Sequence, residues 1–310
     1  MEGWRKKLVL SGVGVVAVAL TALSVAVHYS SMGVGTHGRA ADLYLRIIHE
    51  EGEDLQAAQK GLRLLGADAM PTITNYLAYK DSGFRAMARA LLKKQSLIKF
   101  EIYNKYDYRA MVRKGIHILG SNAAPALVEV FRDQPITYVG EDNLAYLATT
   151  CLVKLGSPSI PALVTGLTND NANVRALSAL AIAASSDVQH WSSVTNLVTC
   201  VDDSNADVRA AAVFALGKVL EEPEATVPAL AKGLGDTNSA VRFHAIHSLW
   251  AFGVHSQPAI PAIEKAVLME TSHPDAGFDQ WELGPKSRDM IMDALTNALE
   301  TIRYHVETPN

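Results

Sequence analysis

Apolar residues in the second half of the chain recur at three- and four-residue steps, and the segments that carry them repeat. In one such segment the apolar positions are Val208, Ala211, Ala212, Ala215 and Leu216. This spacing predicts an amphipathic helix with one buried face. Three of these segments begin with a Val-Arg pair, and their arginines, Arg175, Arg209 and Arg242, follow one another after 34 and 33 residues. Self-similarity at that period predicts a stacked array of helical hairpins.

Glycine and proline mark the turn inside each predicted hairpin. Eleven residues after the arginine position, the aligned copies hold Gly66, Gly120, Gly156, Ser186, Leu220 and Gly253. Glycine just past a helix end permits the backbone that closes it, and proline suits the first turn of the next helix. An asparagine stands three residues before each Val-Arg pair, where a helix N-cap is expected. These columns indicate about six repeats.

The Val-Arg core, the glycine and the Pro-Ala-Leu of the second helix resemble HEAT repeats, in particular the short repeats of bacterial proteins and phycobilin-lyase-like chains. The resemblance covers residues 42–303 and implies an all-α fold, a right-handed α-solenoid of two helical layers. It also implies a structural ladder in which Arg175, Arg209 and Arg242 reach acidic or amide residues of the inter-repeat turns. Asp203 and Asp236 are such residues.

Two segments interrupt the repeat period. The step from Leu55 to Arg109 is 54 residues, about twenty more than one repeat, which predicts an insertion at about 78–106. A stretch with Pro and Gly predicts a loop at about 271–286. After it we expect a final helix at about 287–304, which caps the array because a terminal repeat needs a polar outer face. Residues 305–310 are a tail.

The N-terminus predicts a membrane anchor. Residues 8–27 carry no charge, and about 20 apolar residues are enough to cross a hydrocarbon core of ~30 Å. Three cations, Arg5, Lys6 and Lys7, precede this run and hold that end on the cytoplasmic side. We therefore predict a cytoplasmic basic N-terminus at 1–7, a transmembrane helix at 8–27 and a tether at 28–41. A cleaved signal sequence is the alternative, although its apolar stretch is usually ~7–15 residues.

Both interpretations of the N-terminus place the repeat domain on the exported side, periplasmic or extracellular, and the predicted anchor makes the chain a single-pass membrane protein. The two cysteines, Cys151 and Cys200, fall in predicted helices of different repeats and are expected to be small buried hydrophobes. An oxidising compartment would permit a single bridge between them, which the sequence does not decide.

Charge is distributed unevenly along the chain. The net charge is −4, so no overall basic excess indicates nucleic acid as the partner. The segment from Lys80 to Lys114, however, holds ten Lys or Arg against three acids. Aromatic residues alternate with these cations, as in surfaces that contact anionic lipid. The candidate basic patch is Arg85, Arg89, Lys93, Lys94 and Lys99.

The sequence contains few candidates for catalytic or metal-binding residues. His244 and His247 lie three residues apart on one predicted helix, a spacing that could share a metal ion, but no third ligand stands at a matching offset. Metal-dependent hydroxylases built on HEAT repeats carry His-Glu pairs where this chain has Phe243-His244. No phosphate-binding glycine loop or nucleophile motif occurs. We expect no metal, no cofactor and no catalytic residue.

The sequence therefore favours a membrane-anchored, exported HEAT-repeat scaffold that binds a protein or peptide partner along its second helices. Candidate contact residues on those helices are Glu129, Arg132, Lys232, Glu264 and Lys265. Two alternatives stay open. One is an enzyme of the HEAT fold, bilin-lyase-like or metal-dependent, and the other is a module that binds anionic lipid through the basic insertion.

Overall fold

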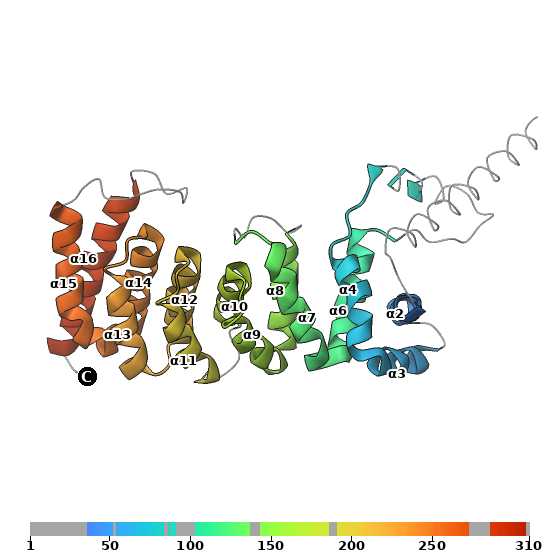
Figure 1. Cartoon of the computed structure of the whole chain (residues 1–310). Coiled ribbons are helices and arrows are strands. Elements are labelled where there is room, and N and C mark those ends of the chain that lie inside the picture. The colour runs from blue at the N-terminus through green and yellow to red at the C-terminus, as the bar shows by residue number, and fades with distance from the viewer. Residues whose placement is uncertain are drawn as a thin grey trace, which may run out of the picture. The chain divides into compact units, whose positions relative to one another are not determined.

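The computed structural model describes residues 36–51, 54–83, 86–87, 89–90, 103–136, 143–185, 191–272 and 286–307. Regular secondary structure in these residues is entirely helical, so the all-α prediction is confirmed for this part of the chain (Figure 1). The chain divides into two compact units, Met1–Ala123 (unit 1) and Ala124–Asn310 (unit 2). The predicted cytoplasmic residues 1–7 and transmembrane helix 8–27 lie outside the described residues.

The described residues of unit 1 include four helices and two short 3-10 turns with defined bounds. They are α2 Thr36–Glu50, α3 Leu55–Leu65, η1 Gly66–Ala69, α4 Met70–Leu77, α6 Lys105–Leu119 and η2 Gly120–Ala123. Helix α2 packs against both α3 and α6, and α4 packs against α6. Leu45, Leu62 and Met111, one from each of α2, α3 and α6, are fully buried in this core. Burying a side chain of this size stabilises the fold by about 1.5–3 kcal/mol.

Helix α2 begins at Thr36, so the last six residues of the predicted tether 28–41 are helical. The sequence prediction was wrong there because it weighed the glycine and serine content of the segment. The apolar side chains at helical spacing, Ala41, Leu45 and Ile48, are at most 3% exposed. Their burial against α3 and α6 outweighs the weak helix propensity of the preceding residues.

Unit 2 contains the regular repeats. Its elements are α7 Ala124–Glu129, η3 Val130–Asp133, α8 Leu144–Leu155, η4 Ser157–Ser159, α9 Ile160–Gly166, α10 Ala172–Ala184, α11 Trp191–Cys200, α12 Ala206–Val219, α13 Pro223–Gly233, α14 Ser239–Phe252, η5 Gly253–Ala259, α15 Ile260–Ser272 and α16 Lys286–Glu307. The first helices of the hairpins, α8, α10, α12 and α14, pack in succession. The second helices α7, α9, α11 and α13 form the other layer, which α15 continues.

Close packing of small residues joins the first helices of unit 2. A side chain added at Gly217 of α12 would lie 2.0 Å from the Oγ of Ser248 and 2.8 Å from its Cα, so α12 and α14 approach almost backbone to backbone. The Ser248 hydroxyl donates to the carbonyl of Val213 on α12, with 2.9 Å between the oxygens. Because the hydroxyl bonds across the interface, the polar group is buried without loss of a partner.

The predicted glycine column closes the first helices. Gly66, Gly120, Gly156 and Gly253 all have φ between +53° and +66°, with ψ between −123° and −139° at their helix ends. Only glycine occupies this region readily, because a Cβ would clash with the neighbouring backbone. Leu220, which replaces glycine in the fifth repeat, takes the left-handed helical conformation instead (φ 54°, ψ 35°).

The two predicted interruptions are described only in part. The insertion predicted at about 78–106 lies between the end of α4 and the start of α6, and residues 84–85, 88 and 91–102 of it lie outside the described part. Helix α15 extends to Ser272, so the described chain stops just inside the predicted loop 271–286. The final helix, α16, is slightly longer than the predicted 287–304 and packs against α14 and α15.

No single helix among the described residues has the length and apolar character needed to cross a membrane. One pair of helical segments, Leu144–Leu155 and Ser157–Gly166, reaches that length and composition together, with a bend of 119° between them. The predicted anchor 8–27 falls outside the residues to which this finding applies and stays a prediction.

Candidate binding surface

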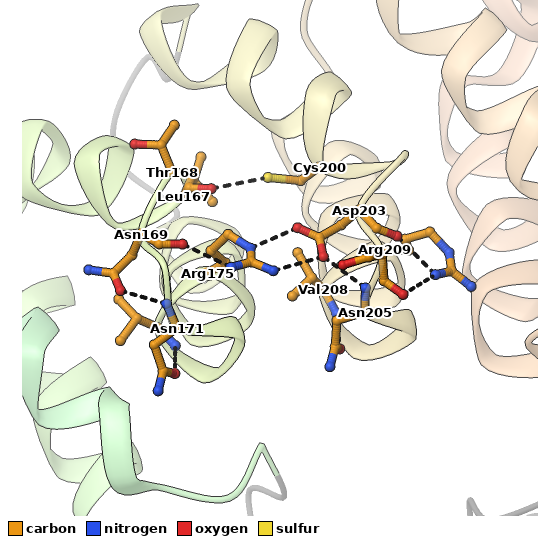
Figure 2. Close-up of polar contacts among 12 residues, drawn as sticks. Leu167, Thr168, Asn169, Asn171, Arg175, Cys200, Asp203, Asn205, Val208 and Arg209 are labelled. Carbon is orange, nitrogen blue, oxygen red and sulfur yellow. Dashed lines mark hydrogen bonds and ion pairs between the residues drawn. The ribbon is translucent and has the colours of Figure 1, made fainter.

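An asparagine N-cap sets the start of each regular first helix. The side-chain oxygen of Asn205 accepts hydrogen bonds from the backbone N–H groups of Asp207 and Val208, at 2.9 and 3.2 Å (Figure 2). Asn171 and Asn238 make the same pair of bonds. Such a cap satisfies backbone donors that have no partner inside the helix, and it stabilises by about 1 kcal/mol. The caps fix the arginine that follows in the same orientation in each repeat.

The arginines connect successive turns. Arg175 donates to both carboxylate oxygens of Asp203 on the next turn, from Nε at 2.7 Å and from Nη2 at 2.9 Å (Figure 2). Arg209 bonds to Asp236 with the same two distances. The remaining guanidinium nitrogen of Arg175 donates to the carbonyl of Asn169 on the turn before its own helix, at 2.8 Å. Each arginine thus joins two neighbouring turns.

Electrostatics inside this ladder favours the charged forms. Burial by itself raises the pKa of Asp203, but the hydrogen bonds from Arg175 and from the backbone of Asn205 outweigh it and lower the pKa. The pKa of Asp236 is lowered in the same way, with Arg209 as the opposing donor. A bidentate arginine–carboxylate pair is among the stronger hydrogen-bonded contacts in proteins. The ladder therefore joins the repeats, and its guanidinium groups bond to other residues of the array.

Arg242, the last arginine of the set, and Cys200 also form hydrogen bonds within the array. Arg242 donates to the carbonyls of Asp236 and Thr237, at 3.0 and 3.2 Å. Cys200 directs its thiol to the carbonyl of Leu167, 3.5 Å away (Figure 2). Burial raises the pKa of this thiol to about 11, so Cys200 is a poor nucleophile at neutral pH. Cys200 and the other cysteine, Cys151, are both buried free thiols.

The five candidate contact residues lie on or beside the second helices of unit 2, where surface ion pairs hold most of them. Arg132 contacts Glu129 and also Asp170, at 3.2 Å. Lys232 contacts Asp202, and Glu264 contacts Arg303. Lys265 is exposed. Ion pairs this exposed contribute about 0–1 kcal/mol, so a partner could displace them at little cost. Except for Glu129 and Arg132, these pairs do not join the candidates to one another.

His244 and His247 lie among aromatic rings. The ring of His244 is 5.3 Å from that of Phe214 on α12, and the ring of His247 is 4.4 Å from that of Phe243. Burial, and then the neighbouring His247, lowers the pKa of His244 to about 4. Within the described ranges, no group of three or more His, Cys, Asp or Glu side chains is placed to hold a metal ion. These contacts are those of packing residues.

The candidate basic patch is described at one position. Arg89 donates to Asp81 at 3.0 Å and to the carbonyl of Tyr103 at 3.3 Å. The remaining members lie outside the residues whose side chains are described: Arg85, Lys93, Lys94 and Lys99. Arg89 therefore joins two parts of the insertion, the segment that follows α4 and the segment that precedes α6.

Sequence reasoning missed a cluster of tyrosines and carboxylates in unit 1. Tyr76 on α4, fully buried, donates to Asp42 on α2, which is 4% exposed. Tyr103 donates to Glu50 at the end of α2. Arg46 contacts Asp42 and lies over the ring of Tyr103, 5.3 Å from its centre. The partners are 34 and 53 residues apart, and no recurring motif marks them, so no local pattern indicates them.

Comparison with known proteins agrees with the repeat architecture. A family profile described as HEAT repeats matches residues 194–275. No curated protein matches the sequence significantly. A chain of the CpcE–CpcF complex of phycocyanin lyase from Nostoc sp. PCC7120 is 23% identical, with 55% of this chain and 97% of that chain covered and a TM-score of 0.42.

Two further solved structures have the same kind of similarity. A chain from the complex of Kap95p with RanGDP is 15% identical over 83% of this chain and 36% of that chain, with a TM-score of 0.47. A designed armadillo repeat protein, solved with the peptide (KR)4, is 17% identical over 74% of this chain and 99% of that chain, with a TM-score of 0.39. What the comparisons establish for this chain is that residues 194–275 match the profile of HEAT repeats.

Proposed function

We propose that this chain is a membrane-anchored scaffold whose repeat domain, on the exported side, binds a protein or peptide partner. The observation that carries the proposal is the internal use of the recurring polar residues. The arginine–aspartate ladder and the asparagine caps are saturated by contacts within the array. The repetition therefore builds a long rigid surface, and stacked helical repeats use such surfaces for binding.

The second helices offer side chains that a partner can reach. The side chains of Glu129, Lys232 and Glu264 are 53%, 66% and 46% exposed. They pair only with exposed neighbours, and such weak pairs exchange readily for contacts to another protein. The two alternatives, an enzyme of the HEAT fold and a lipid-binding module, have less support from the described residues. His244 and His247 pack against aromatic rings, and most of the basic patch lies outside the described side chains.

Capture of a partner with paired charge reversals tests this function. The full-length chain is purified in a nonionic detergent and used to retain proteins from solubilised membranes. One variant carries Lys232→Glu and Lys265→Glu on the second helices. The control carries Lys154→Glu and Lys218→Glu, which change the net charge equally on exposed positions of the first helices. We expect a partner that is retained by the control and lost with the second-helix variant.

The outcomes are distinguishable. Equal loss in both variants would indicate retention by net charge alone, and equal retention would place the contact away from the second helices. Either result contradicts binding through that layer. Circular dichroism of all three proteins must show the same helix content, because only then does loss of the partner report the surface.

A further inference from the structure

Helix α6 presents a cationic face to solvent. Tyr106, Arg109, Arg113 and His117 stand at positions i, i+3, i+7 and i+11, so their side chains leave the helix on the same side. Tyr106, Arg113 and His117 are exposed, and Arg109 is half-buried. Together with Lys105 at the start of the helix, these residues form what we call the α6 cationic face.

Among the described residues of α6, no acidic side chain belongs to this face, and Asp81, which accepts the backbone N–H of Lys105 at 3.5 Å, pairs with Arg89. Asp107, the acid of the first turn, accepts the backbone N–H of Asn104 at 2.7 Å in a capping box. Arg113 forms no ion pair or hydrogen bond with any residue in the described ranges. The adjacent Lys114, by contrast, has a partner within the chain, because its ammonium group is 3.0 Å from Glu51. The charge of Arg113 is therefore available to another molecule.

In the regular repeats, the position equivalent to Arg113 holds a buried apolar residue. It follows the arginine column by four residues, and its equivalents in α10, α12 and α14 are Ala179, Val213 and Ile246, all at most 2% exposed. Those side chains are buried in the core of the array. An unpaired guanidinium cannot take such a place, because its burial without a partner is strongly unfavourable. This face of α6 is thus not an ordinary packing face.

Tyr106 organises the cations around it. Its ring is 62% exposed, with the ammonium group of Lys105 5.2 Å and the guanidinium carbon of Arg109 5.9 Å from the ring centre. Contacts of this type contribute about 0.5–1 kcal/mol at exposed sites. They restrict two long side chains before any partner arrives, which reduces the entropy lost on binding. Tyrosine and arginine are also the residues most enriched at the energetic centres of interfaces.

We propose that the α6 cationic face binds an extended acidic segment of a partner protein, with carboxylates at alternate positions. The proposal rests on the protein-binding function proposed above and names the chemistry of the partner. Successive cations on the face are four residues apart, a rise of about 6 Å along a helix. Same-side residues of an extended chain repeat every ~6.6 Å. The mismatch from Lys105 to Arg113 is about 1 Å, which flexible side chains absorb.

Fluorescence anisotropy with defined peptides tests the spacing. The full-length chain in nonionic detergent is titrated into three labelled octapeptides. One alternates Glu and Ser, the second has four Glu followed by four Ser, and the third replaces every Glu of the first by Gln. We expect the alternating peptide to bind about threefold or more tightly than the block isomer, and the Gln peptide not to bind. Affinity should fall as salt is added, because exposed charges are screened.

Single substitutions locate the site. Arg113→Gln should weaken binding of the alternating peptide about 2- to 5-fold, the range for one exposed ion pair. Combined with Arg109→Gln, the loss should exceed about tenfold. The matched control is Lys218→Gln on α12, since Lys218 is also an exposed cation over an aromatic ring, 5.4 Å from the centre of Phe214. This control should leave the affinity unchanged.

Three results would overturn the inference. The first is equal affinity for the alternating and block peptides, and the second is equal loss in the Arg113 and Lys218 variants. The third is Arg113-dependent binding to phosphatidylserine vesicles without peptide binding, which would make the face a headgroup site. Failure here is separate from failure of the proposed function, because a partner retained through the second helices would leave that function standing.

Discussion

The two units hold their helices together by different polar contacts. In unit 2 the contact recurs, because Arg175 and Arg209 each reach an aspartate 27 or 28 residues ahead with identical bond lengths. In unit 1, Tyr76 and Tyr103 bond to carboxylates of α2 at unrelated separations. Repetition of sequence reproduces the same local electrostatics at each step. The irregular unit instead depends on individual long-range contacts that join α2 to the rest.

Breaking the ladder should give the largest effect. Asp203→Ala removes two bonds to Arg175 and one to the backbone of Asn205, and it leaves a guanidinium of 16% side-chain exposure without its partner. We expect a loss of about 2–3 kcal/mol in the free energy of unfolding, measured by urea denaturation.

The adjacent residue is the control for this change. Asp202 is 61% exposed and contacts only the exposed Lys232, so Asp202→Ala should cost less than about 0.5 kcal/mol. Similar losses for Asp202→Ala and Asp203→Ala would show that the ladder contributes no more than an ordinary surface pair. Three of the four tryptophans, Trp191, Trp250 and Trp281, belong to unit 2, so in a Trp4→Phe background the tryptophan fluorescence follows the transition in that unit.

The second comparison between the units is the effect of replacing a buried helix glycine by alanine. In Gly217→Ala the new methyl group meets the Cα of Ser248 at 2.8 Å, and backbone cannot move aside easily. Overpacking of this kind costs about 1–3 kcal/mol, so we expect a loss of about 2 kcal/mol.

The matched change in unit 1 is Gly115→Ala. Its methyl group meets the end of the Leu45 side chain at 2.6 Å, which can rotate away. The higher helix propensity of alanine, about 1 kcal/mol, then offsets the strain, and stability should hardly change. If both alanine variants melt at the same temperature, close backbone approach does not distinguish the units.

The tyrosine cluster provides the third comparison. Tyr76→Phe removes one donor to the buried carboxylate of Asp42, which keeps its contact with Arg46, and should lower stability by about 1–2 kcal/mol, the range for one hydrogen bond to a charged group. Tyr79→Phe removes a long bond to the exposed Asp81, at 3.4 Å, and should cost less than about 0.5 kcal/mol.

Circular dichroism and fluorescence together locate the effect of Tyr76→Phe. Far-ultraviolet circular dichroism follows the helices of both units, whereas tryptophan fluorescence in the Trp4→Phe background reports unit 2. A shift seen by circular dichroism alone is expected. An equal shift in the tryptophan signal would mean that the two units unfold together, and the cluster would then stabilise the whole chain.

Period and turn chemistry explain why the repeats could be predicted. Helix boundaries follow from residues that act locally, since Asn205 caps the helix it precedes and Gly156 closes the helix it follows. The second-helix contact residues could not be ranked, because exposure and pairing depend on neighbours from other repeats. Helix α2 was partly missed for the same reason, as its stability comes from burial of Leu45 against distant helices.

The pH dependence of stability provides the finest comparison. The pKa of His244 is lowered to about 4 by burial, so between pH 6.5 and pH 4 this side chain is protonated in the unfolded chain and neutral in the folded chain. Stability is therefore complete above pH 6.5 and is lost as the pH falls toward 4, by about 1 kcal/mol at pH 5.5. The aspartates of the ladder have lowered pKa values, so their contribution is present above pH 3.8 and is lost only at lower pH.

His244→Leu isolates this contribution. The leucine fills the space between Phe214 and Phe243 without a titrating group, so the variant should lose less stability between pH 7 and pH 5.5 than the parent protein. His247 retains part of the slope, because burial lowers its pKa as well. Below pH 3.8 both proteins should lose stability together, since they share the ladder. Parallel curves above that pH would instead assign the loss to groups other than His244, and urea denaturation at four pH values decides between the two.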